Sequence, residues 1–597
     1  MNEYRTLWPF FLKYRKRYLI GILSLALADL LQLAPPKILG RLGDAYQNGS
    51  LAPPLLAWSA LGILGVALGI AGFRYLWRLH ISGTARLIET ELRSQLFQHL
   101  QSLPPRFFDE RPVGDLMAHA TNDLTAVRMA LGMGTVLIID ALLLTSATLA
   151  ILLIVIDVRL TLVTLLPLPA MGAVVGYLGQ RIHRRFRTVQ AVFAQLAARA
   201  EQNVTRIRLV KAFGQEQAET QGFDELSLSY VQENLHLAKV HGLLFPSVDL
   251  LSGASLVIAL GYGGPLVLGQ AISLGDFVAL VGYLALLVWP MIAMGWSINI
   301  FQRGAASLGR INALLAEEPG PAAGPAEGGR RLMGKIELKG LTFSYGGNAS
   351  SPPALKDLHL VVEPGETMAI VGPSGSGKTT LANLLLRLYE PEEGQIFIDG
   401  AEIHALPLRS LRENIGYVPQ ESFLFSDTLA ENIAFGRPDA SREEIEAVAR
   451  LACLEEDIAS FSHGYETLVG ERGVALSGGQ RQRVALARAL IRDPAILILD
   501  DSLSAVDAAT EKQILENLRQ FCRGRTTLII SHRLSAVRNS DLIVVLSHGK
   551  IVEMGNHQAL MRQRGWYYRA YRHQLLEANL LRSGAKEEGE SYGRGHP

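Results

Sequence analysis

A glycine-rich turn followed by a lysine and two threonines carries the clearest chemical signal in the sequence. Glycines let the backbone turn tightly enough to aim successive N–H groups at a polyphosphate, the lysine adds a positive charge, and the first threonine hydroxyl can ligate Mg²⁺. The helix expected over residues 379–389 points its positive N-terminal end at the same anion. The turn follows an apolar run at 367–371, so we expect a phosphate site rather than a flexible surface loop. Its residues are Gly372, Pro373, Ser374, Gly375, Ser376, Gly377, Lys378, Thr379 and Thr380.

Two further stretches of this half of the chain predict phosphate chemistry. The apolar run 496–499 ends in Asp500 and Asp501, and acids at the end of a buried strand lie where Mg²⁺ and an attacking water sit in phosphoryl transfer. Helix capping is the competing explanation for a single acid, but the upstream phosphate loop favours chemistry. A serine and two glycines at the start of a helical run predict a second, separate anion-binding end. This second motif comprises Ser477, Gly478, Gly479 and Gln480.

The overall composition indicates several domains, part of them in a membrane. A chain of 597 residues is too long for a single core, and 49% hydrophobic residues with a mean hydropathy of +0.20 is high for a soluble protein. Lys and Arg total 57 against 56 Asp and Glu, so no overall positive field attracts nucleic acid. Cys453 and Cys522 lack C-x-x-C spacing, which favours reduced cytosolic thiols over a zinc or redox site.

Six apolar stretches are each long enough to cross a hydrocarbon core of about 30 Å. The even number places both chain ends on one side, and the basic side chains within 15–17 and 181–187 place that side in the cytoplasm. Residues 1–17 mix aromatic and basic side chains, and we expect an interfacial helix rather than a signal peptide, because no small-residue cleavage site follows. The six predicted spans lie near residues 18–36, 55–77, 132–156, 159–179, 243–268 and 277–298.

The expected fold class is multidomain, with a six-helix all-α transmembrane domain that has long cytoplasmic helical extensions, followed by an α/β P-loop nucleotide-binding domain. Pro, Gly, Ala and Glu near 317–331 indicate a linker, and the polar, Gly-rich chain end indicates a disordered tail. The expected boundaries are an interfacial helix at 1–17, a transmembrane domain at 18–315, a linker at 316–334, an ATPase domain at 335–572, and a helix end with the tail at 573–597.

The polar segments after the second and fourth spans predict helices that continue into the cytoplasm. Their turns, at 104–108 and 206–214, carry aromatic and basic side chains. Such residues either cap a helical hairpin or dock against the ATPase domain. Docking is favoured, because a motion of the membrane domain needs a solid contact for its transmission.

These motifs together resemble a known family. Residues 336 to about 570, with the phosphate loop and the sequence LSGGQ at 476–480, resemble the nucleotide-binding domain of ABC transporters. Six spans followed by that domain resemble the type I exporter half-transporters, over nearly the whole chain. The stretches 114–123, 423–428 and 565–568 resemble bacterial multidrug-resistance-like subunits that pair with a different partner. The resemblance implies ATP and Mg²⁺ as cofactors and a cell inner membrane location, with both termini and the ATPase domain in the cytoplasm.

The resemblance also implies roles for individual residues around ATP. The LSGGQ serine, glycines and glutamine would serve the ATP held by a second subunit. The other implied roles are adenine stacking by Tyr345, contact with Mg²⁺ by Thr379, Gln420 and Asp500, catalysis by Asp501 with His532 on the γ-phosphate, and a position across the dimer interface for Asp507.

Asp501 departs from the family pattern, because most active members have glutamate there. A side chain one methylene shorter places its carboxylate about 1 Å short of the attacking water, a misplacement that can reduce the rate about a hundredfold. Our hypothesis is that this phosphate loop binds ATP but that cleavage there is slow. A heterodimer with a second ABC half-transporter, whose strand ends in Asp-Glu, is therefore favoured over a homodimer with two slow sites.

Polar, aromatic and methionine side chains within the spans are candidates for substrate binding. Charged residues are costly in lipid and are expected to face a cavity or another helix, while methionine and aromatic residues form an adaptable apolar surface. Helix packing explains each of them equally well. A small hydrophobic or amphipathic compound fits this set, and a lipid or peptide remains the alternative. The candidates are Asp29, Gln32, Asp140, Asp249, Trp289, Met294 and Trp296.

Three other classes of ABC protein compete with an exporter. A soluble ABC protein acting on DNA or ribosomes conflicts with six consistently oriented spans, and an importer conflicts with the fusion of membrane and ATPase halves in one chain. A regulatory subunit, whose bound ATP holds an interface while a partner performs hydrolysis, remains open beside the heterodimeric exporter.

Overall fold

The structure is a computed structural model that describes residues 2–321, 331–345, 352–470, 473 and 476–576. It divides into two compact units, one of Met1–Gln101 and Arg111–Glu318 and the other of Ser102–Glu110 and Pro319–Pro597. Residues 322–330 of the expected linker and residues 577–597 of the expected tail lie outside the described part of the chain.

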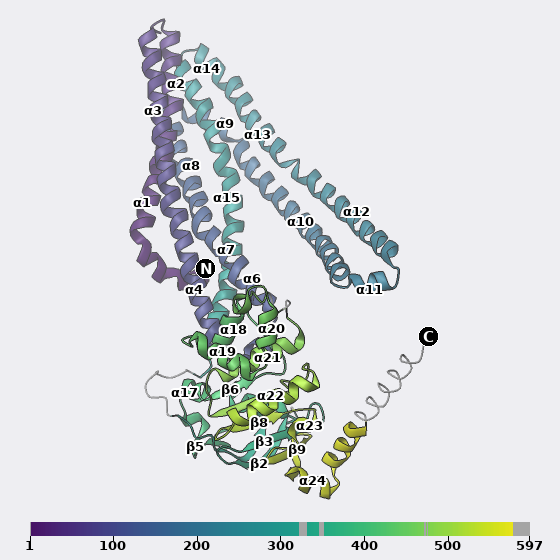
Figure 1. Cartoon of the computed structure of the whole chain (residues 1–597). Coiled ribbons are helices and arrows are strands. Elements are labelled where there is room, and N and C mark those ends of the chain that lie inside the picture. Colours follow the sequence, from purple (N-terminus) through teal and green to yellow (C-terminus); the bar gives the residue numbers. More distant parts are fainter. Residues whose placement is uncertain (1, 322–330, 346–351, 471–472, 474–475, 577–597) are drawn as a thin grey trace. The chain divides into compact units, whose positions relative to one another are not determined.

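The first unit is helical (Figure 1). Its described helices include six that are long and apolar enough to cross a membrane, which confirms the expected number of spans. They are Glu3–Gln47, Pro53–Ser102, Val113–Ile154, Val158–Thr205, Glu216–Leu268 and Leu274–Leu315. The described elements of this unit are η1 (Asn2–Leu7), α1 (Trp8–Gln32), α2 (Ala34–Gln47), α3 (Pro53–Trp77), η2 (Arg78–Ser82), α4 (Gly83–Ser102), α6 (Val113–Ala118), η3 (His119–Asp123), α7 (Leu124–Met129), η4 (Ala130–Gly134), α8 (Thr135–Val155), α9 (Val158–Leu165), α10 (Pro167–Thr205), α11 (Ile207–Ala212), α12 (Glu216–His241), α13 (Leu244–Ile258), η5 (Ala259–Gly263), α14 (Gly264–Leu268) and α15 (Leu274–Leu315).

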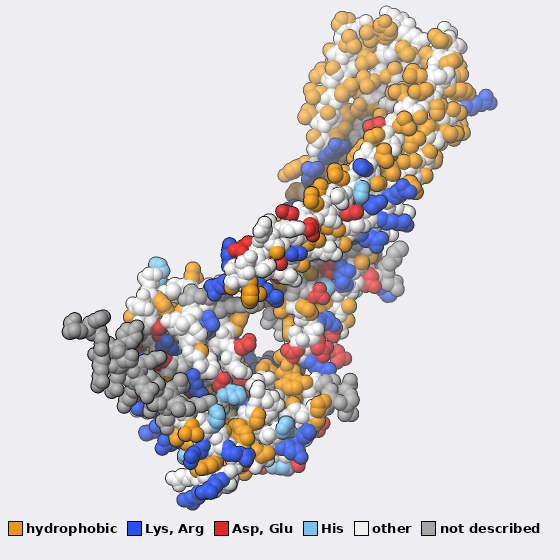
Figure 2. Space-filling model, turned by 90° about the vertical axis from the view of Figure 1, so that its right-hand side faces the viewer, with side chains coloured by type: hydrophobic (Ala, Val, Ile, Leu, Met, Phe, Trp, Pro, Cys, Tyr) orange, Lys and Arg blue, Asp and Glu red, His pale blue; other side chains and the backbone are white. Residues whose placement is uncertain are grey.

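Side-chain caps mark the starts of two of these helices. The Asp157 side chain accepts a hydrogen bond from Leu160 N (2.7 Å) at the start of α9, and the Ser273 hydroxyl accepts from Asp276 N (2.9 Å) at the start of α15. Both contacts satisfy backbone N–H groups that a helix start leaves unpaired. Figure 2 shows that hydrophobic side chains cover one half of this bundle and charged ones gather on the other half, as expected for helices that leave the lipid.

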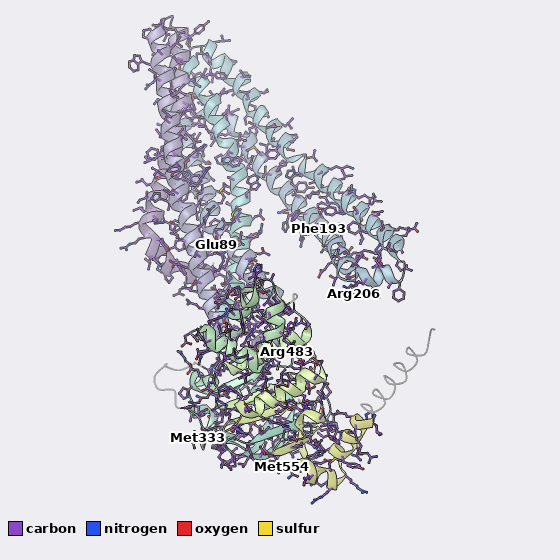
Figure 3. All side chains as sticks on the ribbon, in the orientation of Figure 1. Glu89, Phe193, Arg206, Met333, Arg483 and Met554 are labelled. Carbon is purple, nitrogen blue, oxygen red and sulfur yellow. The ribbon has the colours of Figure 1, made fainter. Side chains whose placement is uncertain are left out.

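The extension formed by α10 and α12 is held together by side chains between the two helices. Phe193 packs on Tyr230 with ring centroids 5.7 Å apart, and Arg199 Nε donates to Glu219 (3.2 Å). Figure 3 labels Phe193 along this extension and Arg206 beside its turn. The docking expected for this second turn remains a prediction.

The second unit contains two sheets. The strand orders are β2-β1-β4-β5, all antiparallel, and β10-β9-β3-β8-β7-β6, in which only the β10–β9 pair is antiparallel. Its described elements are α5 (Pro105–Glu110), β1 (Ile336–Phe343), β2 (Leu355–Val362), β3 (Thr367–Val371), α16 (Lys378–Leu385), β4 (Ile396–Ile398), β5 (Ala401–Glu402), η6 (Ile403–Ala405), α17 (Leu408–Glu413), β6 (Ile415–Val418), α18 (Leu429–Ala434), α19 (Arg442–Leu451), α20 (Glu455–Ser460), η7 (Gly464–Glu466), α21 (Gly478–Leu490), β7 (Ile496–Asp500), α22 (Ala508–Phe521), β8 (Thr526–Ile530), α23 (Leu534–Val537), β9 (Leu542–Ser547), β10 (Lys550–Gly555) and α24 (His557–Gln563).

The parallel part of the larger sheet determines where the functional residues meet. Strands β3 and β7 are almost entirely buried and apolar, as expected for parallel strands covered on both faces. Because β3, β8, β7 and β6 run in the same direction, their carboxyl ends lie at one edge of the sheet. Asp500 is the last residue of β7, and the phosphate loop, Gln420 and His532 follow the ends of β3, β6 and β8 in the sequence.

The helix after the phosphate loop begins as predicted but ends earlier. It was expected over 379–389, and α16 ends at Leu385. Arg387 adopts a left-handed backbone (φ 47°), which cannot continue a right-handed helix. Its guanidinium bonds to Glu390 (3.1 Å) and to the carbonyl oxygens of Ile403 and Leu406 (both 3.4 Å), so tertiary contacts hold the chain in this turn.

The first of the two cytoplasmic turns, at 104–108, belongs to the second unit. Ser102–Glu110 is compact with the ATPase fold rather than with the helical bundle. Tyr389 donates its hydroxyl hydrogen to Asp109, and Gly320 N donates to Ser102 O (2.8 Å). The docking expected for this turn is therefore confirmed, and the aromatic pair Phe107 and Phe108 lies within the docked segment.

Candidate functional site

The phosphate loop folds around glycines that no other residue can replace without strain. Gly372 and Gly377 have φ angles of +149° and +100°, and a Cβ on Gly372 would overlap the carbonyl oxygen of Leu546. The loop passes directly from buried β3 into α16, whose first residue is Lys378. This strand, turn and helix place backbone N–H groups and a helix N-terminus around one point, which is the arrangement that binds phosphate.

Lys378 is poised at this point. Its side chain is only 6% exposed, and Nζ donates to the carbonyl oxygens of Gly372 (3.1 Å) and Pro373 (2.8 Å). Burial lowers the pKa of Lys378 below its ordinary value, while the carboxylates of Asp500 and Asp501 oppose that shift. A phosphate oxygen would give the Lys378 ammonium group a negatively charged partner, which the neutral loop carbonyls do not provide.

The predicted residues around this loop come together in one pocket of about 300 Å³. Tyr345 lies at its side, where its hydroxyl donates to Thr380 Oγ1 (2.9 Å). The pocket is lined by Tyr345, Ala354, Ser374, Gly375, Ser376, Gly377, Lys378, Thr379, Thr380, Gln420, Asp500, Asp501, Ile530 and His532. The structure thus joins the phosphate loop, the strand-end acids, Gln420 and His532, which lie far apart in the sequence.

The oxygen atoms beside the loop fit Mg²⁺. Asp500 is 1% exposed, and its Oδ2 has no hydrogen-bond partner among the described residues. Burial raises the pKa of Asp500, and a hydrogen bond from Thr379 and the charge of Lys378 oppose that rise. An unpaired buried carboxylate oxygen, a hydroxyl and the Gln420 amide are hard oxygen ligands of the kind Mg²⁺ takes beside phosphates.

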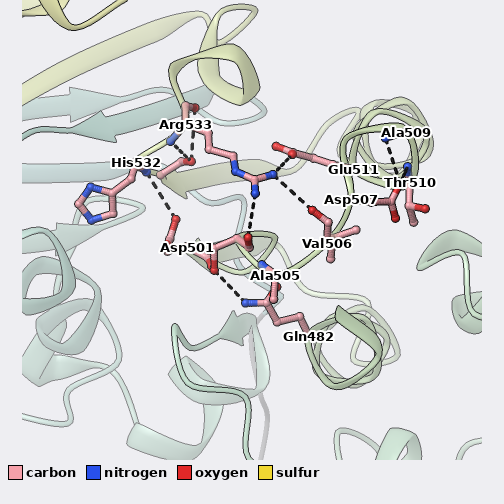
Figure 4. A network of polar contacts seen from close by, with 12 residues as sticks. Gln482, Asp501, Ala505, Val506, Asp507, Ala509, Thr510, Glu511, His532 and Arg533 are labelled. Atoms are coloured by element: carbon pink, nitrogen blue, oxygen red, sulfur yellow. Dashed lines mark hydrogen bonds and ion pairs between the residues drawn. The ribbon is translucent and has the colours of Figure 1, made fainter. Parts of the chain in front are cut away.

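Asp501 is held by an unusual backbone. Its φ is +44°, in the left-handed region, and its N–H donates to Ile530 O (2.8 Å). The His532 N–H points to Asp501 Oδ1 across a long contact of 3.5 Å. Figure 4 shows Asp501 below His532 in this arrangement. Asp501 and His532, which follows the end of β8, therefore lie next to each other and beside the phosphate loop.

The LSGGQ residues lie outside this pocket. Ser477 and Gln480 form a reciprocal cap at the start of α21, with Gln480 N donating to Ser477 Oγ (3.2 Å) and Ser477 N donating to Gln480 Oε1 (2.8 Å). Gly478 and Gly479 are the first two residues of that helix. Asp507 likewise has a local role, since it caps α22 by accepting from Ala509 N (3.1 Å) and Thr510 N (3.0 Å).

Sequence reasoning missed a network that joins these elements (Figure 4). Gln482, on the LSGGQ helix, donates to Ser504 Oγ (3.0 Å) and accepts from Ala505 N (2.9 Å). Arg533, next to His532, donates to Ser504 O (2.8 Å) and forms an ion pair with Glu511. The only signal for Arg533 was its position beside His532, and nothing in the local sequence singles out Gln482.

The polar candidates within the spans separate into two groups. Asp29 is 2% exposed and accepts from Gln32 Nε2 (3.2 Å), and Asp140 is close enough to Asp29 for their charges to interact. Arg74 donates to Gln32 Oε1 (3.2 Å) and was missed, although it is the one charge in the apolar stretch 55–77. Asp249 is exposed on α13, apart from this cluster.

The aromatic candidates lie on α15. Trp289 and Trp296 meet edge to face with ring centroids 5.8 Å apart. They and Met294 are between 43% and 47% exposed in this single chain. They form an apolar surface, as expected from the sequence.

Comparison with known proteins agrees with this architecture. Residues 18–291 match the family described as ABC transporter transmembrane region, and residues 355–504 match the family described as ABC transporter. The chain is 40% identical to the probable multidrug resistance ABC transporter ATP-binding/permease protein YheI of Bacillus subtilis, over 95% of this chain and 97% of that protein. It is 39% identical to the multidrug resistance-like ATP-binding protein MdlA of Escherichia coli, over 97% and 98%.

Two further similarities broaden the comparison. The ATP-dependent lipid A-core flippase of Chromobacterium violaceum is 36% identical, over 96% of this chain and 97% of that protein. The structure of a bacterial Atm1-family ABC exporter with ATP bound is similar with a TM-score of 0.77 and 30% identity, over 94% of this chain and 98% of that chain.

Proposed function

This chain belongs to the ABC transporters and joins a membrane half and an ATPase half in one polypeptide, and we propose that it exports hydrophobic or amphipathic compounds of the multidrug type. It is an ATP-driven transporter of the inner membrane, with six spans and its ATPase domain in the cytoplasm. The observation that carries the proposal is the pocket in which the phosphate loop, Asp500, Asp501, Gln420 and His532 meet, in a chain with six spans.

The residues of the pocket would act on ATP as follows. Lys378 would exchange its contacts with the Gly372 and Pro373 carbonyls for phosphate oxygens. Tyr345 would stack on the adenine. Thr379, Asp500 and Gln420 would hold Mg²⁺, which neutralises phosphate charge when bound. Asp501 would orient the water, and the His532 imidazole would contact the γ-phosphate.

We propose that this site cleaves ATP slowly and that the transporter is a heterodimer. The Asp501 carboxylate is one methylene shorter than glutamate, and its backbone is held by the bond to Ile530 O (2.8 Å). The backbone therefore cannot move forward easily to compensate for the short side chain. The partner would be a second half-transporter whose strand ends in Asp-Glu. The LSGGQ serine, glycines and glutamine of this chain would then serve the partner's ATP, and Asp507 would lie across the dimer interface.

The cluster of Asp29, Gln32 and Asp140 supports a substrate with a cationic group. Carboxylates are costly in lipid and take a positively charged or hydrogen-bonding partner, and within the protein Arg74 reaches this cluster through Gln32. The exposed Trp289, Met294 and Trp296 would offer apolar contacts to the rest of the compound. Asp249 would contribute less, because it lies apart from the cluster.

Lipid export is the second candidate, favoured by the 36% identity to a protein named as a lipid A-core flippase. ATP-dependent uptake into inverted membrane vesicles separates the two. Uptake of a cationic dye and of a neutral amphiphile supports multidrug export, whereas movement of a labelled lipid without dye uptake supports lipid export. Peptide uptake would indicate a third substrate class, and full activity of a homodimer would contradict the heterodimer.

Asp140→Asn is expected to reduce uptake of a monovalent cationic dye about tenfold or more, because a contact between a cation and a carboxylate contributes about 1.5–3 kcal/mol. Uptake of a neutral amphiphile is expected to change less than twofold. The matched control is Asp249→Asn, which removes an intramembrane carboxylate outside the cluster. Equal loss of cationic and neutral uptake in Asp140→Asn would assign Asp140 to helix packing instead.

A further inference from the structure

A glutamine near the end of the described chain holds the loop that carries His532. Gln574 lies on the helix over 566–576. Its Nε2 donates to His532 O (2.8 Å), and its Oε1 accepts from Leu534 N (2.9 Å). One side-chain amide therefore bonds two backbone groups on either side of Arg533.

The two backbone groups that Gln574 bonds have few other hydrogen-bond partners in reach among the described residues. Leu534 is the first residue of α23, and the first N–H groups of a helix have no acceptor within that helix. The other backbone contact of His532, from its N–H to Asp501 Oδ1, is long at 3.5 Å. The two short bonds to Gln574 thus contribute strongly to the position of the backbone from which the imidazole extends.

The helix that carries Gln574 is itself firmly attached to the sheet. Glu553 on β10 accepts from the backbone N–H groups of Trp566 and Tyr567, the latter at 3.1 Å. The Tyr567 side chain is fully buried and packs in a cluster that includes Leu534 and Val537 of α23. Its hydroxyl is hydrogen-bonded to His557 Nδ1 (2.9 Å). A rigid helix can therefore fix the loop through Gln574.

We propose that Gln574 is a positioning residue for ATP hydrolysis. By holding the backbone at His532, it fixes the distance of the imidazole from the phosphate loop. The inference rests on the proposed role of His532 at the γ-phosphate. Gln574 is not among the residues that line the nucleotide pocket, so it acts on the hydrolysis step and leaves ATP binding unchanged. The helix over 566–576 thereby becomes part of the catalytic machinery without contacting nucleotide.

The test compares Gln574→Leu with Arg572→Ala in the full-length chain in lipid nanodiscs. Arg572 is an exposed residue two positions away on the same helix and is the matched control. ATP turnover is measured with the native Asp501 and in an Asp501→Glu background. Gln574→Leu is expected to lower kcat about tenfold at unchanged KM, because small displacements of a catalytic group reduce the rate steeply. Arg572→Ala is expected to match its parent.

A double variant and a measurement without turnover make the test decisive. In the His532→Ala background, Gln574→Leu is expected to cause no further loss, and an additional tenfold loss or a weakened ATP affinity would overturn the proposal. Hydrogen–deuterium exchange at Leu534 is expected to become faster in Gln574→Leu, and unchanged exchange would overturn it independently of catalysis. If neither Asp501 background hydrolysed ATP, the role of His532 would fail, while the exchange result would still decide whether Gln574 fixes the loop.

Discussion

Lys378→Met is expected to lower the ATP turnover of this chain, assayed without a partner, about a thousandfold, the loss typical of removing one well-placed electrostatic contact to a transition state. Lys378 is 6% exposed and donates to two loop carbonyls 2.8 and 3.1 Å away. It is therefore already directed into the pocket before any phosphate arrives. The measurement is phosphate release by the purified chain.

The control for this variant is Lys512→Met, which makes the same substitution at a side chain that is 80% exposed. It is expected to leave ATP turnover within twofold of the parent. Thermal unfolding without nucleotide separates a lost phosphate contact from a damaged loop, since Lys378→Met also removes the donor for the Gly372 and Pro373 carbonyls. Residual turnover above about a tenth of the parent would show that the pocket is not the site of hydrolysis.

The parts of the site that depend on local spacing were predictable from the sequence. Glycines at fixed intervals, a lysine and a hydroxyl fold into the same turn wherever a strand precedes and a helix follows. Parallel strands then bring Asp500 and His532 to that turn, because their carboxyl ends share an edge of the sheet. The six spans were predictable for a similar reason, since hydrocarbon thickness sets their length.

The contacts that hold these residues were not predictable, because they join segments with no shared local pattern. Gln482 meets Ser504 and Ala505 only after α21 and the loop before α22 have packed. Gln574 reaches His532 O across 42 positions of sequence. The early end of α16 has the same origin, since Arg387 turns the chain to reach Glu390 and two carbonyl oxygens. Tertiary contacts here override helix propensity.

The assignment of Ser102–Glu110 to the second unit also exceeds what periodicity can predict. Aromatic and basic residues at a helical turn are compatible with capping as well as with docking. The decisive feature is the contact of Tyr389 with Asp109, in which the two residues lie 280 positions apart. Burial and this hydrogen bond raise the pKa of Tyr389 above its ordinary value, so the phenol remains the donor at physiological pH.

Asp501→Glu is expected to raise the ATP turnover of this chain about a hundredfold, equivalent to about 2.7 kcal/mol of activation free energy. The added methylene carries the carboxylate about 1 Å toward the attacking water. The left-handed backbone at Asp501 (φ 44°) opposes the change, because aspartate tolerates this region better than glutamate does. That cost is about 1 kcal/mol of folding stability. It is smaller than the expected decrease in activation free energy, so we still expect a faster rate.

The measurement is steady-state phosphate release by the purified chain without any partner. Asp501→Asn is the matched control, since it keeps the shorter side chain and removes the charge, and it is expected to be no faster than the parent. Native protein that hydrolyses ATP at tens per second would contradict the slow site and favour a homodimer. A gain of less than about threefold in Asp501→Glu would favour the regulatory subunit, in which ATP at this pocket holds an interface. A hundredfold gain would instead mean that Lys378, Asp500 and His532 are already placed for catalysis and that carboxylate reach limits the rate.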